Sequence, residues 1–364
     1  MLDVFNQIYQ GKTVIVTGHT GFKGSWLVLW LKKMGARVIG YSLSAPSNPS
    51  HYELLDIAHT SVLGDIRDED KLQKTFAIYK PDIVFHLAAQ PLVRYSYENP
   101  IETYDINVMG TLKVFDACNK CNVKAIVNVT SDKCYDNKEW IWGYRENDNM
   151  GGYDPYSSSK ACAELLTSSY RNSFFNPKEF LKTHSTLIAS CRAGNVIGGG
   201  DWGKDRLIPD VIRSVSVNKK VIIRSPDSTR PWQHVLEPLS GYLQIGQKLL
   251  ESDLNFADCW NFGPNYLEYY TVRELIEVMQ QYWKGIDCFF DYDPNQPHEA
   301  RCLKLDCSKA NFFLNWNSVW NFHQTLEKTV NWYKNYYENG IINTEEDLQS
   351  YISDAKRKKL RWAL

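Results

Sequence analysis

Residues 13–24 read TVIVTGHTGFKG, and this stretch decides the fold of the chain. The first five of these residues are all β-branched, which is typical of a strand buried in a parallel sheet. Glycines follow at positions 18, 21 and 24, and an apolar segment of helical length begins at Ser25. The spacing is G-x-x-G-x-x-G rather than the G-x-G-x-x-G of the standard fingerprint. A strand, a glycine-rich turn and a helix N-terminus predict a pyrophosphate site, because the backbone can approach the anion and the first helical N–H groups point at it.

Beyond this turn, strand and helix patterns alternate as far as residue 192. Further strands are predicted at 37–41, 62–65, 83–89, 125–131 and 187–192, and helices at 107–120 and 156–170. Such alternation predicts an α/β fold with a Rossmann-type, doubly wound parallel sheet. Ligands of such sheets gather at the carboxyl ends of the strands, where Asp65, Ala88 and Ser131 are expected.

Composition narrows the class of protein. The chain has 364 residues, 43% of them apolar, enough for a large core, and its formal charge of −1 argues against a nucleic-acid partner. No apolar stretch approaches the ~18 residues of a membrane span, and the N-terminus lacks the pattern of a secretion signal. Nine scattered cysteines predict reduced thiols in the cytoplasm. We expect no metal site.

Tyr156 and Lys160 carry the strongest chemical signal outside the glycine turn. Four residues apart on a helix, they project from the same face. A lysine charge can lower a tyrosine pKa that starts near ~10, which predicts a phenolate base for oxidising an alcohol.

The cofactor is predicted from residues 42–44, which read Ser-Leu-Ser after the second strand. An acidic residue there would suit the ribose of NAD, and an arginine would suit a 2′-phosphate. Neither is present, but residues 42–60 contain no lysine or arginine, which favours NAD.

Several motifs resemble the extended short-chain dehydrogenase/reductases. These are the T-G-x-x-G-x-x-G turn, Asn107-Val108-x-Gly110-Thr111 and Tyr156-x-x-x-Lys160. Within that superfamily, residues 18–26 (GHTGFKGSW), 130–135 (TSDKCY) and 151–160 (GGYDPYSSSK) resemble CDP-glucose 4,6-dehydratases. Residues 297–300 (PHEA), followed by 303–306 (LKLD), add a fourth match.

The resemblance implies a domain organisation and a set of binding residues. Residues 1–192, completed by 233–262, would form the NAD-binding domain, and 193–232 with 263–364 a smaller C-terminal lobe that binds the nucleotide sugar. The implied NAD-binding residues are Gly18, Thr20, Gly21, Phe22, Gly24, Asp65, Ile66, Leu87, Ala88, Ala89, Asn107, Tyr156 and Lys160. The implied residues for CDP-glucose are Gln90, Arg94, Asn195, Arg206, Arg230 and Arg301.

The resemblance also implies a reaction in three steps. Tyr156, assisted by Lys160, would deprotonate the sugar 4-hydroxyl as hydride passes to NAD, and Ser131 would hydrogen-bond that oxygen. Water would then leave across C5 and C6, with Asp132 and Lys133 as the acid–base pair, before hydride returns to C6. Lysine is a base only when it is neutral, so whether Lys133 or Asp132 handles each proton stays open.

Two other functions remain open on sequence alone. The same fold supports nucleotide-sugar epimerases and 4,6-dehydratases of other nucleotide sugars, although an epimerase has no use for Asp132-Lys133. A non-catalytic nucleotide-binding protein is the remote alternative, against which Ser131, Tyr156 and Lys160 argue. Related enzymes pair through the helices around Asn107 and Tyr156, so we expect a homodimer or a dimer of dimers, with no membrane partner.

Overall fold

The computed structural model describes residues 2–223, 225–265, 270–291 and 302–364. The predicted substrate residue Arg301 and the 297–300 motif lie outside these ranges. In the part of the chain that is described, no helix is long and apolar enough to cross a membrane.

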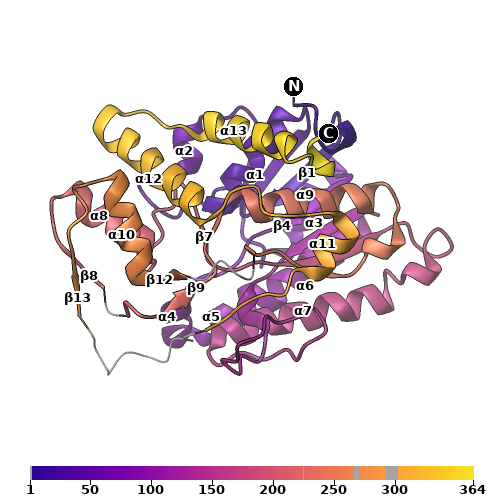
Figure 1. Cartoon of the computed structure of the whole chain (residues 1–364). Coiled ribbons are helices and arrows are strands. Elements are labelled where there is room, and N and C mark those ends of the chain that lie inside the picture. Colours follow the sequence, from indigo (N-terminus) through magenta and orange to yellow (C-terminus); the bar gives the residue numbers. More distant parts are fainter. Residues whose placement is uncertain (1, 224, 266–269, 292–301) are drawn as a thin grey trace.

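A seven-stranded parallel sheet forms the centre of the molecule, with the strand order β11-β6-β5-β4-β1-β2-β3 (Figure 1). Its strands are β1 (Thr13–Thr17), β2 (Arg37–Ser42), β3 (Thr60–Leu63), β4 (Ile83–His86), β5 (Ala125–Val129), β6 (Leu187–Arg192) and β11 (Cys259–Asn261). The predicted doubly wound parallel sheet is therefore confirmed. β3 ends earlier than the predicted strand, so Asp65 lies in the loop after it.

Helices cover both faces of this sheet. They are α1 (Phe22–Lys33), α2 (His51–Leu55), α3 (Glu69–Tyr79), α4 (Val93–Glu98), α5 (Pro100–Tyr104), α6 (Thr111–Lys120), α7 (Pro155–Ser173) and α9 (Leu236–Leu250), with short turns η1 (Phe5–Gln7), η2 (Asp105–Gly110), η3 (Asp132–Cys134), η4 (Pro177–Glu179) and η5 (Leu254–Phe256). Val14 and Val16 join α1 and α9 in one buried cluster, whereas Ile15 joins α3, α6 and α7 in another. Because side chains alternate along a strand, one apolar run can supply both cores.

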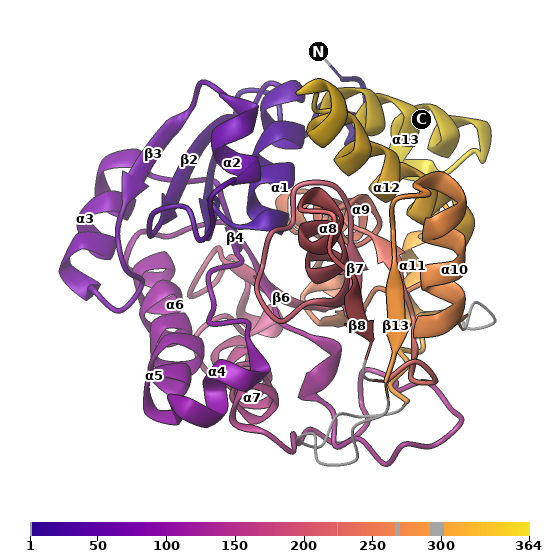
Figure 2. The ribbon, with the colours of Figure 1, turned by 90° about the vertical axis from the view of Figure 1, so that its left-hand side faces the viewer.

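A second group of elements packs beside the sheet (Figure 2). It comprises β7 (Val196–Ile197), α8 (Leu207–Ser216), β8 (Val221–Ile223), β9 (Thr229–Arg230), β10 (Gln233–His234), β12 (Tyr270–Thr271), α10 (Val272–Tyr282), β13 (Cys288–Phe290) and α12 (Phe322–Asn339). Its own buried cluster includes Ile212, Leu275 and Leu326. The spacing Thr271-x-x-Glu274 predicts a capping box, and the structure confirms it at the start of α10, where the two residues bond reciprocally.

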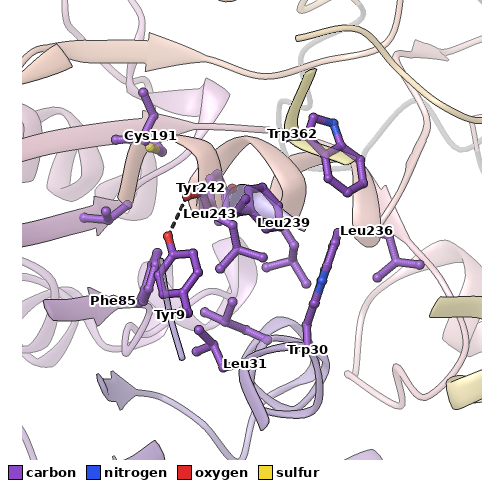
Figure 3. Packing of buried hydrophobic residues seen from close by; sticks show 14 of the residues in the cluster. Tyr9, Trp30, Leu31, Phe85, Cys191, Leu236, Leu239, Tyr242, Leu243 and Trp362 are labelled. Carbon is purple, nitrogen blue, oxygen red and sulfur yellow. Dashed lines mark hydrogen bonds between the residues drawn. The ribbon is translucent and has the colours of Figure 1, made fainter. Parts of the chain in front are cut away.

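The C-terminal segment returns to the first core rather than staying with this group. It contains α11 (Ser308–Leu314), α13 (Thr344–Arg357) and η6 (Arg361–Ala363). The Trp362 ring stacks on the Phe5 ring at 5.1 Å between centroids. It lies 5.7 Å from the Trp30 ring (Figure 3). Residues 348–363, which the sequence placed in the second lobe, thus contribute side chains to the core beneath α1 and α9.

Candidate active site

The glycine turn between β1 and α1 forms a cradle that excludes side chains. Gly18 has a φ of 73°, and a Cβ atom there would stand 2.8 Å from the backbone nitrogen of Ala88. At Gly24 a Cβ atom would stand 2.1 Å from the Gly18 carbonyl oxygen. Thr17 Oγ1 accepts hydrogen bonds from the Leu87 and Ala88 N–H groups, at 3.1 and 3.2 Å. The glycine turn and the loop at Leu87 and Ala88, both predicted to bind the cofactor, therefore approach each other through their backbones. Exposed backbone N–H groups at such a place suit a pyrophosphate.

Tyr156 lies in the first turn of α7, beside Ser131. Asp154 caps this helix by accepting a hydrogen bond from the Ser157 N–H group, and Pro155 occupies its first position. Burial raises the pKa of Tyr156 to about 12, although a hydrogen bond with Ser131 lowers it. The predicted lowering of this pKa is therefore wrong for this structure, because desolvation of the phenolate and the nearby Asp132 carboxylate dominate.

Lys160 follows Tyr156 on the same buried face of α7 and is 6% exposed. Burial lowers the pKa of Lys160 to about 8, and the charge of Glu164, on the same helix, opposes this shift. The lysine is thus close to changing its protonation state near neutral pH.

Asp132 and Lys133 occupy the η3 turn that follows β5. The Asp132 carboxylate is 3% exposed and accepts a hydrogen bond of 3.0 Å from Ser131 Oγ. The Lys133 N–H group donates to the same hydroxyl at 3.2 Å, and its side chain is half-buried. The three predicted residues of this turn therefore share one hydrogen-bonded unit within reach of Tyr156.

Arg206 is the predicted substrate residue that the fold brings to this unit. Its Nη1 donates to Asp201 Oδ2 at 2.9 Å, and its charge lowers the pKa of Tyr156. Arg94 Nη1, on α4, lies 3.8 Å from Asp205 Oδ1.

Three other predicted substrate residues, Asn195, Gln90 and Arg230, make their contacts elsewhere. Asn195 accepts a hydrogen bond from the Gln233 N–H group through its carbonyl, and Arg230 lies in β9. The Gln90 amide bonds Leu92 and Thr103, so it is engaged within the protein. None of these contacts joins them to Tyr156.

Asn107 organises the loop after β4. Its Oδ1 accepts from the Gln90 N–H group at 2.8 Å, and its Nδ2 donates to the Gln90 carbonyl at 3.1 Å and to Ser159 Oγ at 2.9 Å. The predicted cofactor residue Asn107 thus links α7 to the loop that contains Ala89. It acts on the backbone around the site.

Asp65, a predicted NAD-binding residue in the loop after β3, pairs with Arg67. The guanidinium Nη2 lies 2.7 Å from Asp65 Oδ2, and this hydrogen bonding lowers the pKa of the carboxyl. Ile66 is buried, and Thr20 Oγ1 bonds Ser42 Oγ at 2.9 Å. The Asp65 carboxylate is therefore already paired with a cation.

Lys23, in the first turn of α1, was missed from the sequence as a charged neighbour of Arg206 and Asp132. Burial, followed by the charge of Arg206, lowers the pKa of Lys23 to about 8. Asp132, Lys160 and Asp201 are the other charged groups that act on it. The sequence offered a signal for Lys23, because this lysine lies within the glycine turn at 18–24 that was predicted to bind a pyrophosphate. Across the described residues, no group of three His, Cys, Asp or Glu side chains could hold a metal.

Comparisons with known proteins identify the family. The GDP-mannose 4,6 dehydratase family profile matches residues 15–329. A CDP-glucose 4,6-dehydratase of Salmonella typhimurium is 55% identical over 355 residues, which cover 96% of this chain and 98% of the relative. The chain belongs to the GDP-mannose 4,6 dehydratase family. This places it among the extended short-chain dehydrogenase/reductases, as the sequence motifs indicated.

Two solved structures share this fold. An epimerase of Methanothermobacter thermautotrophicus superposes with a TM-score of 0.80 at 24% identity, covering 92% of this chain and 96% of that one. A UDP-glucose 4-epimerase of Brucella ovis, solved with NAD, gives a TM-score of 0.73 at 20% identity, covering 88% and 97%. These likenesses support the fold alone.

Proposed function

We propose that this protein converts CDP-glucose to CDP-4-dehydro-6-deoxyglucose, a dehydration without net redox change. The observation that carries the proposal is the Ser131–Asp132–Lys133 unit, hydrogen-bonded beside Tyr156. A tyrosine that takes the proton of an alcohol, beside a cofactor that takes the hydride, can serve the oxidation, and the carboxyl of Asp132 and the amine of Lys133 can serve the elimination. The 55% identity to a CDP-glucose 4,6-dehydratase supports the choice of sugar and base.

NAD is the proposed cofactor, and the glycine cradle fits its pyrophosphate. Residues 18–24 and the backbone of Leu87 and Ala88 would hold it. When bound, NAD supplies a hydride acceptor and donor together with a positively charged ring.

The oxidation step depends on Tyr156 and Ser131. The phenol must lose its proton to take one from the sugar 4-hydroxyl, and the pKa of about 12 opposes this. Positive charge beside the phenol favours the phenolate, and Arg206 already supplies some. Ser131 Oγ is placed to hydrogen-bond the same sugar oxygen, which would stabilise the developing alkoxide.

The elimination step depends on Asp132 and Lys133. Once C4 is a ketone, the C5 proton is acidic, and a base must remove it while an acid protonates the departing 6-hydroxyl. Asp132 is buried and bonded to Ser131, whereas the Lys133 side chain is half-buried. We assign the pair to this step. The variants Lys133→Met and Asp132→Asn distinguish which residue removes the C5 proton.

Substrate binding is assigned to Arg206, Asn195, Arg230 and Arg94. The charge of Arg206 acts on Tyr156, whereas Arg94, on α4, lies 3.8 Å from Asp205. Guanidinium groups suit diphosphate oxygens because they offer several fixed N–H donors.

We also propose that two chains pair through α5, η2 and α7, which lie side by side (Figure 2). This surface exposes apolar side chains, with Ile101 85%, Met109 45% and Leu165 59% exposed. Burying such side chains against a second copy is favourable. Light scattering should give a dimer or tetramer for the native protein and a monomer for an Ile101→Asp, Leu165→Asp double variant.

The cytoplasm is the proposed compartment. All nine cysteines are free, as expected where thiols stay reduced. Cell fractionation with antibody detection would test this.

Incubation of the purified protein with CDP-glucose tests the proposed reaction. Parallel incubations would contain dTDP-glucose, UDP-glucose and GDP-mannose, each with and without added NAD. We expect a 4-keto-6-deoxy product, seen as loss of water by mass and absorbance in alkali, from CDP-glucose alone. Turnover of another nucleotide sugar would overturn the specificity, and isomerisation without water loss would favour an epimerase.

A further inference from the structure

A buried ion pair contacts the residues on either side of residues 131–134, the catalytic turn, which contains Ser131, Asp132 and Lys133. Arg192 Nη2, at the end of β6, stands 2.7 Å from Glu164 Oε2 on α7, and both side chains are 3% exposed. Burial raises the pKa of Glu164, but Arg192 and hydrogen bonds outweigh it, so the pKa lies below its ordinary value. Both groups are therefore charged. Removing two charges from water costs free energy that their mutual attraction often fails to recover. The pair is therefore weak evidence for stability, and its other hydrogen bonds indicate its role.

The carboxylate end of the pair holds the residue before the catalytic turn. Glu164 Oε1 accepts a short hydrogen bond from Thr130 Oγ1, and Oε2 accepts one of 2.7 Å from Ser190 Oγ. Thr130 is the residue immediately before Ser131.

The guanidinium end holds the residue after the catalytic turn. Arg192 Nη1 donates to Tyr135 Oη at 2.6 Å and to the Glu146 carbonyl at 2.9 Å. Tyr135 Oη donates onward to Asn261 Oδ1 at 2.8 Å. Tyr135 immediately follows the η3 turn.

We propose that the Glu164–Arg192 pair is a positioning device that grips both ends of residues 131–134. Glu164 follows Tyr156 and Lys160 at intervals of four residues along α7, so the device ties the helix face that bears those groups to the turn that bears Ser131, Asp132 and Lys133. Charged hydrogen bonds in a low-dielectric interior are strong and directional, which suits this task. The assignment of the turn to catalysis rests on the proposed function.

Two hydroxyl deletions test the device, because Thr130 and Ser190 both donate to Glu164 but only Thr130 adjoins the turn. We expect Thr130→Val and Ser190→Ala to lower the thermal midpoint similarly. Thr130→Val should lower kcat about tenfold or more with little change in KM, since small displacements of reacting groups are costly. Ser190→Ala should keep kcat within about twofold. Tyr135→Phe, at the other end, should behave as Thr130→Val does.

A second measurement is independent of turnover. Amide hydrogen exchange of residues 131–134 should accelerate in Thr130→Val and Tyr135→Phe but not in Ser190→Ala. Unchanged exchange and unchanged kcat in both turn-flanking variants, or an equal loss in Ser190→Ala, would overturn the device. Absence of dehydration in the native protein would instead overturn the proposed function, while the exchange comparison would still decide the device.

Discussion

Asp132 lies directly against Gly194: a Cβ atom at residue 194 would stand 1.7 Å from Asp132 Oδ2. The carboxylate is 3% exposed, so it has no free space into which to swing. We expect Gly194→Ala to displace it and to lower kcat by about 100-fold, because about 1 Å of misplacement is that costly. Steady-state kinetics checks this.

Gly263→Ala is the matched control, since a Cβ atom there would make an ordinary contact of 3.5 Å with Cys307. It should retain kcat. Full activity of Gly194→Ala would show that the position of Asp132 is not critical.

Lys133→Met should separate the two roles in the elimination. If Lys133 moves the C5 proton, the variant should lose water elimination, and solvent deuterium should enter C5 about 10² to 10⁴ times more slowly. Mass spectrometry of the product in D₂O measures both. Lys138→Met, at an exposed lysine of the same segment, should be silent. Retained exchange in Lys133→Met with its loss in Asp132→Asn would assign the proton to Asp132.

Lys23→Met should weaken ligand binding while stabilising the fold. Lys23, Lys160 and Arg206 are three cations near two carboxylates, an arrangement that an anionic diphosphate would relieve. A lysine near a helix N-terminus also opposes the helix dipole. We expect about tenfold weaker binding of NAD or CDP-glucose by calorimetry, together with a higher thermal midpoint.

Lys32→Met provides the control for Lys23, because it lies in the last turn of the same helix, where a cation is favourable. It should leave both affinities unchanged. Titration of each ligand separately shows which diphosphate Lys23 serves, and unaltered affinity for both would remove Lys23 from the site.

Four buried histidines should make the fold sensitive to acid. Burial lowers the pKa of His19 from 6.5 to about 4. Burial lowers the pKa of His51, His86 and His234 from 6.5 to about 3 each. As the pH falls through 6.5, the histidines of the unfolded chain bind protons that the folded protein does not yet bind. The free energy of unfolding is therefore highest above pH 6.5 and declines towards pH 3. Each proton contributes about 1.4 kcal/mol per pH unit.

His51→Gln should reduce that slope by one proton, since glutamine can still bond Ser25 and Thr344, the partners of the imidazole. Urea unfolding across pH 4 to 7 measures the slope. The exposed His323 provides a control, and His323→Gln should leave the slope unchanged. Equal slopes in the native protein and His51→Gln would contradict the expectation.

Local patterns predicted much of the fold and part of the site. The β-branched run at 13–17 became β1, and the capping box at Thr271 opened α10, because both depend on residues adjacent in the chain. The doubly wound parallel sheet, with Gly18 and Ala88 at the carboxyl ends of its strands, followed from general rules for such sheets, whereas the strand order was not predicted. The pKa of Tyr156 did not follow, because burial depends on what the rest of the fold places around the ring.

The sequence by itself determined the strand, the glycine turn and the common helix face of Tyr156 and Lys160, since strand and helix periodicity are local properties. The tertiary structure alone decided that the charges of Arg206 and Asp132 would act on Lys23, and that Trp362 would pack on Phe5. It also decided that Glu164 would bond Thr130 and that Arg192 would bond Tyr135, the residues on either side of residues 131–134. These contacts join residues far apart in the chain, and their geometry depends on how whole layers pack rather than on any repeating local pattern.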